Sequence, residues 1–248
     1  MSLSSFGTDM NVVVIGASGG IGRALTRILT DNPTVARLMA FSRSGSVLEH
    51  PKVHHHRLDL EDEATIARAA ELAAVDGRTL DLVIVAAGIL HDGDALRPEK
   101  TWRAIDGAAL ERLYRINTVG PALVAKHFLP LLARERKSVF AALSARVGSI
   151  SDNELGGWHA YRASKAALNM LIKTFSIELA RRNPRAVCVG LHPGTVDTRL
   201  SAPFKANVPE GKLFTPDHSA SRLVEVLDRL DASDSGKVFA WDGQLIPS

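Results

Sequence analysis

The stretch VVVIGASGGIG, residues 12–22, decides the fold of this chain. Its first four residues are apolar and β-branched, which is typical of a strand that is buried on both faces. Glycines follow, and a pattern of helical period begins at Ile21. Glycine permits a tight turn and close approach of a phosphate, and the free N–H groups of the next helix attract an anion. The stretch therefore predicts a phosphate-binding turn, with a purely structural turn as the alternative.

The alternation of strand and helix continues to the end of the chain. The predicted strands are 11–16, 37–42, 53–60, 80–88, 138–144, 186–194 and 237–243. The predicted helices are 21–32, 63–75, 103–133, 157–182 and 216–230. Such alternation forms a parallel sheet covered by helices on both faces. We expect one doubly wound α/β domain over residues 1–248, with a sheet of about seven strands and an N-terminal tail over 1–10.

Composition narrows the kind of protein. The chain has 248 residues, a net charge of +3 and a single cysteine, Cys188, so that no intramolecular disulfide is possible. No segment has the length and apolarity of a membrane span or the pattern of a secretory leader. Lys and Arg are scattered and are not interleaved with aromatic residues. We therefore expect a cytoplasmic protein that binds neither a membrane nor nucleic acid.

The end of the second predicted strand, FSRSG (41–45), indicates the coenzyme. In dinucleotide-binding folds, an acidic residue at this place binds the ribose of NAD, whereas an arginine accommodates the 2′-phosphate of NADP. Ser42 and Arg43 stand where the acidic residue would be. The sequence thus favours NADP(H) over NAD(H), with an ordinary surface arginine as the alternative.

A second motif, YRASK, places Tyr161 and Lys165 one helical turn apart on one face of a helix. A free tyrosine has a pKa of about 10, which is too high for efficient proton exchange at neutral pH. A nearby cation favours the phenolate. The pair is therefore predicted to be a tuned acid/base.

Together these motifs resemble those of the short-chain dehydrogenase/reductase family, in the family's order and at about its intervals. The resemblance rests on GASGGIG (16–22), AAG (86–88), NTVG (117–120), ALSARVG (142–148), YRASK (161–165) and HPGTVDT (192–198). The segment SISDNELGGWHA (149–160) and the ending WDGQLIPS (241–248) are similar to one branch, that of C-factor and the sniffer-type carbonyl reductases.

The resemblance implies an NADP(H)-dependent oxidoreductase of Rossmann fold that transfers hydride between the coenzyme and a small carbonyl or alcohol substrate. It gives Tyr161 the role of proton donor or acceptor and has Lys165 lower the pKa of that tyrosine. Ser144 would hydrogen-bond the substrate carbonyl, and Asn117 would support a water-linked proton path. The implied coenzyme contacts are Gly16, Ser18, Gly20, Ile21, Gly22, Arg43, Asp59, Leu60, Ala87, Gly88, Tyr161, Lys165, Pro193, Gly194, Val196 and Thr198.

Two of these assignments have alternatives in the sequence itself. The interval from Ser144 to Tyr161 is longer than is usual in the family, so Ser149 is a competitor for the serine role. Pro121 has no N–H to donate to the carbonyl of Asn117, four residues earlier. We therefore predict a kink at this point and an ordered water between Asn117 and Lys165, with a buried structural amide as the alternative for Asn117.

Three weaker sequence signals bear on a metal site, on the substrate pocket and on a lid over that pocket. Alternate side chains of a strand share a face, so at most His54 and His56 could ligate together, and we expect no metal site. His91 and Trp158 are candidates for the substrate pocket. The long irregular segment 195–214 is predicted to be a lid that sets substrate preference.

The alternative to an enzyme is a catalytically weak coenzyme-sensing signalling or binding protein of the C-factor type, because fold alone does not fix function. The paired Tyr161 and Lys165 favour the enzyme, since binding alone needs no such pair. Members of the family commonly form homodimers or homotetramers through two long helices, here about 103–133 and 157–182, and we expect a homo-oligomer.

Overall fold

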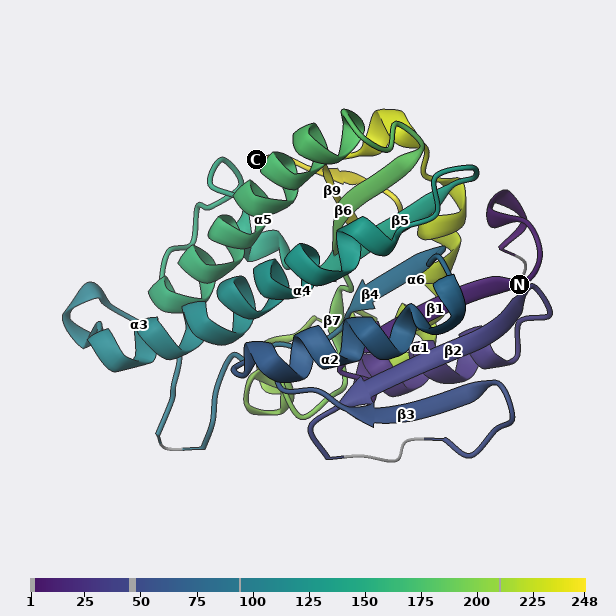
Figure 1. Cartoon of the computed structure of the whole chain (residues 1–248). Coiled ribbons are helices and arrows are strands. Elements are labelled where there is room, and N and C mark those ends of the chain that lie inside the picture. Colours follow the sequence, from purple (N-terminus) through teal and green to yellow (C-terminus); the bar gives the residue numbers. More distant parts are fainter. Residues whose placement is uncertain (1–2, 45–47, 94, 210) are drawn as a thin grey trace.

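The computed structural model describes residues 3–44, 48–93, 95–209 and 211–248, and its centre is one twisted sheet (Figure 1). The strand order is β10-β9-β6-β5-β4-β1-β2-β3. The strands are β1 Met10–Ile15, β2 Val35–Ser42, β3 Val53–Arg57, β4 Leu82–Val85, β5 Ser138–Leu143, β6 Ala186–His192, β9 Val238–Ala240 and β10 Leu245–Ile246. Every neighbouring pair is parallel except β9 with β10. The predicted doubly wound α/β fold with about seven parallel strands is therefore confirmed.

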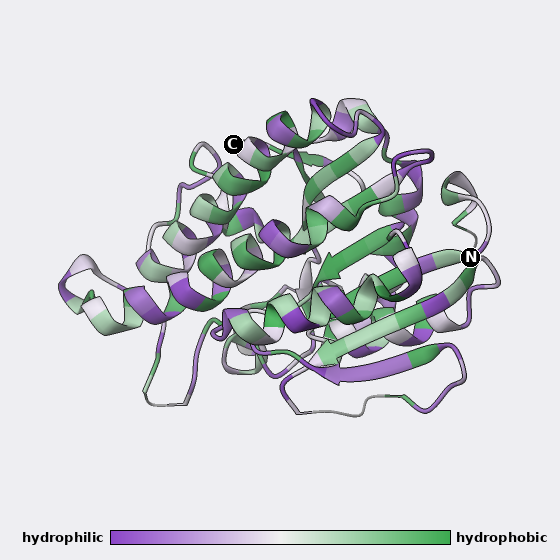
Figure 2. Ribbon diagram, viewed as in Figure 1, coloured by the Kyte–Doolittle hydropathy of each residue, from purple (hydrophilic) through white to green (hydrophobic). Residues whose placement is uncertain are grey.

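Helices cover the sheet on both faces, as Figure 1 shows. They are α1 Gly20–Thr30, α2 Glu63–Ala73, α3 Gly107–Tyr114, α4 Gly120–Phe128, α5 His159–Ala180 and α6 Pro216–Arg229. Val12 and Val14 of β1 belong to one core, which β1 forms with α1 and α6. Val13 and Ile15 belong to a second core with α2, α4 and α5. Because successive strand residues point to opposite faces, a continuous apolar strand fills both cores (Figure 2).

The N-terminal segment is more tightly packed than a tail. Ser4–Phe6 form a short 3-10 helix, and Leu3 and Phe6 are fully buried in the core beside α6. The backbone N–H of Ser5 donates to Asp228 at 2.9 Å, which fixes the segment to the end of α6. Residues 1 and 2 of the predicted tail lie outside the described residues.

The predicted helical region 103–133 is divided into several helices. A 3-10 turn at Trp102–Ala104 precedes α3, and a π-helical stretch, Arg115–Val119, joins α3 to α4. The N–H of Gly120 donates to the carbonyl of Arg115, five residues back. The backbone thus leaves α-helical hydrogen bonding at the position where Pro121 led us to expect a kink, and π-helical turns of this kind are frequent at functional sites.

The predicted lid segment 195–214 contains regular pieces that its sequence did not indicate. Thr195–Val196 (β7) pairs in parallel with Leu213–Phe214 (β8), and Ala202–Asn207 forms a 3-10 helix. Two-residue strands are too short for a periodic pattern, which explains why they were missed. Residue 210 lies outside the described part of this segment, and the lid function stays a prediction.

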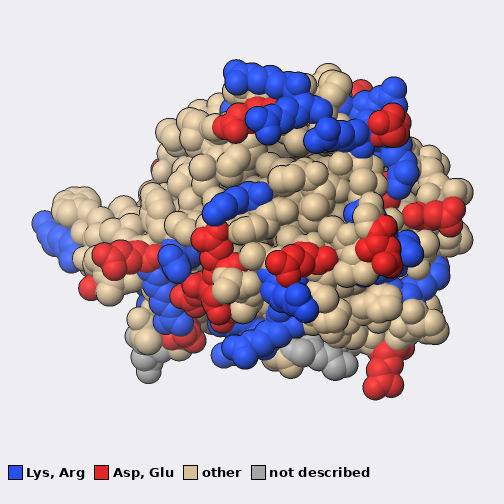
Figure 3. Space-filling view, in the orientation of Figure 1, with Lys and Arg blue, Asp and Glu red and all other residues tan. Residues whose placement is uncertain are grey.

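Charged side chains of both signs are scattered in groups over the face drawn in Figure 3, between larger areas of uncharged residues. Lys and Arg gather along its top, over the end of α5, where Arg181, Arg182 and Arg185 are exposed. Cations are favoured at this end of a helix because the last carbonyl groups carry partial negative charge. In the described part of the chain, no helix is both long and apolar enough to span a membrane.

Candidate active site

Two adjoining cavities open at the carboxyl edge of the sheet, where β1 and β4 lie side by side. From β1 the chain continues to β2 and β3 on one side, and from β4 it continues to β5 and β6 on the other. Ligands of open α/β sheets bind at such a reversal of strand order. Both cavities are lined by Ala86, Ala87 and Gly88, so together they form one elongated cleft.

The glycine turn between β1 and α1 borders this cleft. Gly16 has a φ of 88°, and a Cβ atom there would lie 2.7 Å from the backbone nitrogen of Ala87. A Cβ atom on Gly22 would overlap the carbonyl of Gly16. Both positions therefore require glycine. No side chain caps the start of α1, which leaves the first turn of the helix suited to an anion such as a phosphate.

The first cavity lies over the ends of β1, β2 and β3. The predicted coenzyme contacts that line it are Gly16, Ser18, Arg43, Asp59, Leu60, Ala87 and Gly88. Arg43 is exposed at its rim, directly after β2. Gly20 and Gly22 do not line either cavity, and Gly20 instead packs tightly against Thr198.

The second cavity brings three of the predicted catalytic residues together. Ser144, Tyr161 and Lys165 all line it. The other predicted contacts there are Ile21, Ala87, Gly88, Trp158, Pro193, Gly194, Val196 and Thr198. Ser149 does not line this cavity, and its hydroxyl accepts the N–H of Asp152 at 3.1 Å. The placement favours Ser144 over Ser149 as the serine of the site.

Hydrogen bonds fix two of these three side chains and leave the third available. Ser144 donates to Asn169 Oδ1 at 2.6 Å, and Lys165 Nζ donates to the carbonyl of Leu143 at 2.8 Å. Lys165 Nζ lies 5.8 Å from the centre of the Tyr161 ring. The Tyr161 hydroxyl makes no hydrogen bond to the part of the protein that the structure describes. The Tyr161 hydroxyl is therefore free to donate to a ligand in the cavity.

Burial acts on both members of the Tyr161–Lys165 pair. Tyr161 is 8% exposed and Lys165 is 4% exposed. Burial raises the pKa of Tyr161 above its ordinary value and lowers the pKa of Lys165 to about 8, because both charged forms lose solvation. We predicted that Lys165 lowers the pKa of Tyr161. In the structure burial raises that pKa instead, and the Lys165 ammonium donates to the carbonyl of Leu143. The lowering of this pKa stays a prediction for the complex with oxidised coenzyme.

The Asn117 side chain is fully buried and holds the chain segment that follows β4. Its Oδ1 accepts the N–H of Ile89 at 2.9 Å, and its Nδ2 donates to the carbonyl of the same residue at 2.8 Å. The Nδ2 atom also donates to Ser164 Oγ at 3.2 Å. These contacts agree with the alternative that Asn117 is a buried structural amide. The Asn117 main-chain carbonyl lies in the π-helical stretch. The water-linked path from it to Lys165 stays a prediction.

The two candidates for the substrate pocket have different positions. Trp158 lines the second cavity, and its ring centre lies 6.3 Å from that of Tyr161 and 4.9 Å from that of Phe204. His91 is not among the lining residues; its Nε2 lies 3.0 Å from the carbonyl of Arg199, and its ring centre lies 6.0 Å from that of Phe204. Phe204 and His192 also line the cavity and were missed, although His192 directly precedes Pro193 in a motif already quoted.

The cleft fits a dinucleotide on its own geometry. A glycine turn without a side-chain cap borders it, and Arg43 and Asp59 line the first cavity. The second cavity leads to Tyr161 and Lys165. A two-nucleotide coenzyme would place its phosphates at the turn and one nucleoside in each cavity.

Comparison with known proteins agrees with this geometry. A family model described as short chain dehydrogenase matches residues 10–209. The C-signal protein of Myxococcus xanthus is 36% identical over 143 residues, which are 58% of this chain and 81% of that protein. The NADPH-bound carbonyl reductase from chicken fatty liver is 28% identical, with a TM-score of 0.84 over 97% of this chain and 100% of that one. Carbonyl reductase Sniffer of D. melanogaster is 24% identical, with a TM-score of 0.82 over 96% and 100% of the two chains, and shows the fold alone.

Proposed function

This chain belongs to the short-chain dehydrogenase family and is an oxidoreductase, and from this premise we propose that it is an NADP(H)-dependent carbonyl reductase. The predicted family and its C-factor and sniffer-type branch are confirmed. The observation that carries the proposal is the presence of Ser144, Tyr161 and Lys165 in one cavity that adjoins the glycine turn. The alternative role as a coenzyme-sensing binding protein has no comparable observation in its favour.

The proposed reaction assigns a separate task to each side chain. Bound coenzyme supplies the hydride. Tyr161, whose hydroxyl is free and whose raised pKa keeps it protonated, donates a proton to the carbonyl oxygen of the substrate. Ser144 would orient that oxygen by a hydrogen bond after its hydroxyl turns away from Asn169 Oδ1. Lys165 binds the nicotinamide ribose, and Asn117 keeps the segment 88–90 in place through its two hydrogen bonds to Ile89.

The proposed preference for NADP(H) rests on Arg43. Its guanidinium is exposed at the rim of the first cavity, after the second strand of the fold. Arginine offers a planar set of donors that matches a phosphate group. One similar protein, the reductase from chicken fatty liver, binds NADPH, which supports the same coenzyme here. Asp59, which also lines this cavity, would contact the adenine.

The test is oxidation of NADPH by the purified protein in the presence of a panel of aldehydes and ketones, with wild type beside Tyr161→Phe. We expect turnover in the wild type and a loss of about 10²–10⁴-fold in kcat for the variant, because general acid catalysis contributes about that much. The variant should still bind NADPH, as followed by coenzyme fluorescence. Equal rates in the two proteins would contradict the assignment of Tyr161, and NADPH binding without any carbonyl turnover would favour the sensing protein.

A further inference from the structure

The helix that carries Tyr161 begins without a capping side chain of its own. α5 is the longest helix of the described chain, with 22 residues, and the residue at its N-cap, Trp158, makes no side-chain cap hydrogen bond. Its first turn contains no acidic residue. The first N–H groups of a helix have no partner within the helix, so a first turn without a cap opens easily. Tyr161 is the third residue of α5 and therefore lies in this turn.

Glu99, in the segment between β4 and α3, supplies the missing acceptors. Its two carboxylate oxygens lie 3.3 and 3.4 Å from the backbone nitrogen of Ala160, the residue before Tyr161. Its main-chain carbonyl accepts the N–H of Trp158 at 2.5 Å. Leu96, from the same segment, is buried in one cluster with Ala160 and Tyr161. A distant part of the chain thus caps the beginning of α5.

The Glu99 carboxylate lies where a charge is costly. The residue is 5% exposed, and no Lys, Arg or His of the described chain forms an ion pair with it. A buried charge without a cationic partner destabilises a fold unless other groups compensate for the lost solvation. Here the N–H of Ala160 and the partial positive charge at the N-terminus of α5 provide that compensation. An apolar residue would avoid the cost, so the glutamate points to a task at the beginning of α5.

The turn that leads into α5 has a strained backbone and is held from two sides. Gly156, Gly157 and Trp158 have φ values of 62°, 65° and 51°, in the left-handed region that favours glycine. On one side, Arg162 Nε donates to the carbonyls of Gly156 and Gly157 at 3.2 and 3.0 Å. On the other side lies Glu99. Strain of this kind persists only where surrounding contacts fix the backbone, and it is frequent at functional sites.

We infer that Glu99 is a positioning residue for the proton donor, and that its carboxylate holds Tyr161 in place through the first turn of α5. This inference rests on the proposed function. Glu99 lines neither cavity of the cleft, so it acts through the helix and does not touch the substrate. The same turn carries Trp158, whose ring centre lies 6.3 Å from that of Tyr161 in the second cavity. Loss of the cap should disturb proton transfer to the substrate and leave coenzyme binding as it is.

The test compares Glu99→Ala and Glu99→Gln with Asp106→Ala as the matched control. Asp106 caps α3 by accepting the N–H of Ala109 at 2.8 Å, and it lines neither cavity. Removal of either cap should lower the midpoint of thermal unfolding by about 2–4 °C. Only Glu99→Ala should also lower kcat, by about ten- to hundredfold, because a displacement of about 1 Å at the reacting groups can cost that much. Glu99→Gln keeps an acceptor oxygen but loses the charge, and should give an intermediate kcat.

Three further readouts distinguish positioning from a general loss of stability. In Glu99→Ala the dissociation constant of NADPH should not change, so that the loss is confined to kcat. The solvent deuterium isotope effect on kcat should rise, because proton transfer from Tyr161 becomes slower. Hydrogen–deuterium exchange at residues 158–162 should be faster than in wild type, and this measurement needs no substrate.

The outcomes separate this inference from the function on which it rests. Unchanged kcat in Glu99→Ala, or equal losses of kcat in Glu99→Ala and Asp106→Ala, would overturn the positioning role and leave the carbonyl reductase intact. If Glu99→Ala does not fold, wild-type kcat and wild-type exchange at 158–162 in Glu99→Gln would overturn it. A wild-type protein that binds NADPH but reduces no carbonyl compound would overturn the proposed function, and the positioning role with it, even where the exchange data confirm the cap.

Discussion

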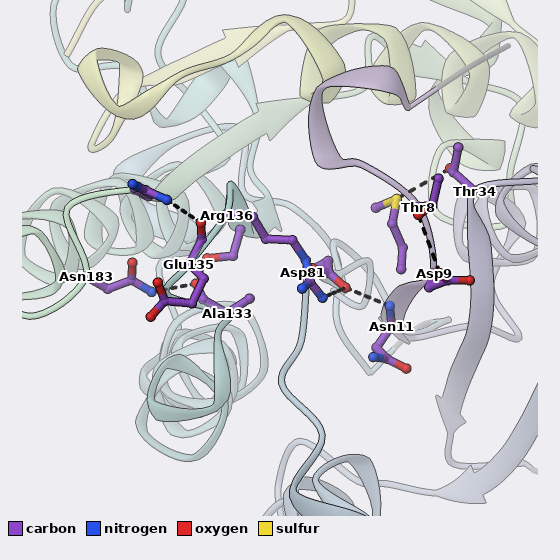
Figure 4. A network of polar contacts seen from close by, with 12 residues as sticks. Thr8, Asp9, Asn11, Thr34, Asp81, Ala133, Glu135, Arg136 and Asn183 are labelled. Atoms are coloured by element: carbon purple, nitrogen blue, oxygen red, sulfur yellow. Dashed lines mark hydrogen bonds and ion pairs between the residues drawn. The ribbon is translucent and has the colours of Figure 1, made fainter.

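At the amino edge of the sheet the buried carboxylate of Asp81 is fully used by its neighbours (Figure 4). It accepts the N–H of Asn11 at 2.8 Å and two guanidinium donors of Arg136 at 2.5 and 3.1 Å. At the carboxyl edge, by contrast, the Tyr161 hydroxyl and the His192 imidazole have no hydrogen-bond partner in the described structure. The first edge uses polar groups to hold the sheet, and the second keeps them available for ligands.

Two buried or partly buried lysines, Lys137 and Lys165, show the same difference between the amino and the carboxyl edge of the sheet. Lys137, at the amino edge, donates to the carbonyl groups of Leu227 and Asp228 and to Ser5, and lies 4.5 Å from the centre of the Phe6 ring. It fixes the end of α6 and the N-terminal segment. Lys165 at the carboxyl edge is deeply buried and has one hydrogen-bond partner among the described residues, the carbonyl of Leu143. Since an ammonium has three donors, two of them remain for coenzyme and substrate.

The largest expected effect concerns the amino edge. Asp81→Ala should lower the free energy of unfolding by about 3 kcal/mol, because it removes one member of a partly buried ion pair and leaves the N–H of Asn11 without its acceptor. Urea unfolding followed by circular dichroism measures this, with the exposed Asp31→Ala as the matched control. NADPH affinity of the folded variant should be unchanged. A large loss of NADPH affinity with little loss of stability would instead assign Asp81 to ligand binding and contradict its structural role.

The next effect belongs to the carboxyl edge. Arg43→Asp should weaken NADPH binding about tenfold or more, since charge-assisted hydrogen bonds to the 2′-phosphate are lost and a like charge is introduced. NADH binding should change much less, and the free energy of unfolding should stay within about 0.5 kcal/mol of wild type. Fluorescence titration with both coenzymes gives the two dissociation constants. Parallel losses for NADH and NADPH would show that Arg43 does not read the 2′-phosphate.

The smallest effect is a pH dependence. Burial lowers the pKa of Lys165 to about 8, and an anionic coenzyme raises that pKa on binding. Binding is then coupled to proton uptake above pH 8, so NADPH affinity should fall several-fold between about pH 7 and pH 9.5. Lys165→Met should remove this dependence. Lys137→Met is the matched control, because burial also lowers the pKa of Lys137 to about 8, but far from the cleft; an equal effect there would contradict the role of Lys165.

Much of this arrangement could be predicted from the sequence because it depends on local patterns. Buried β-branched runs indicated the parallel strands, and the glycine spacing indicated the turn that Gly16 and Gly22 require. The spacing of Tyr161 and Lys165 placed both on the face of α5 that lines the cavity. These features need only a helical or strand period and the sequence order of the elements.

The rest depends on contacts between distant segments. The burial of Leu3 and Phe6 needs the end of α6, and β10 pairs with β9 over two residues, which is too short for a pattern. His91 was expected in the pocket from its position after a strand, but its imidazole lies against Phe204 and the carbonyl of Arg199. The raised pKa of Tyr161 follows from its burial, which no spacing reveals.

Hydrogen–deuterium exchange with and without NADPH tests the difference between the two edges most directly. The account predicts slower exchange in residues 16–22, 86–91 and 192–198, which border the cleft. Exchange at Asp81 and at 136–138, on the amino edge, should not change. Protection confined to the amino edge, or no protection at the carboxyl edge at saturating NADPH, would contradict it.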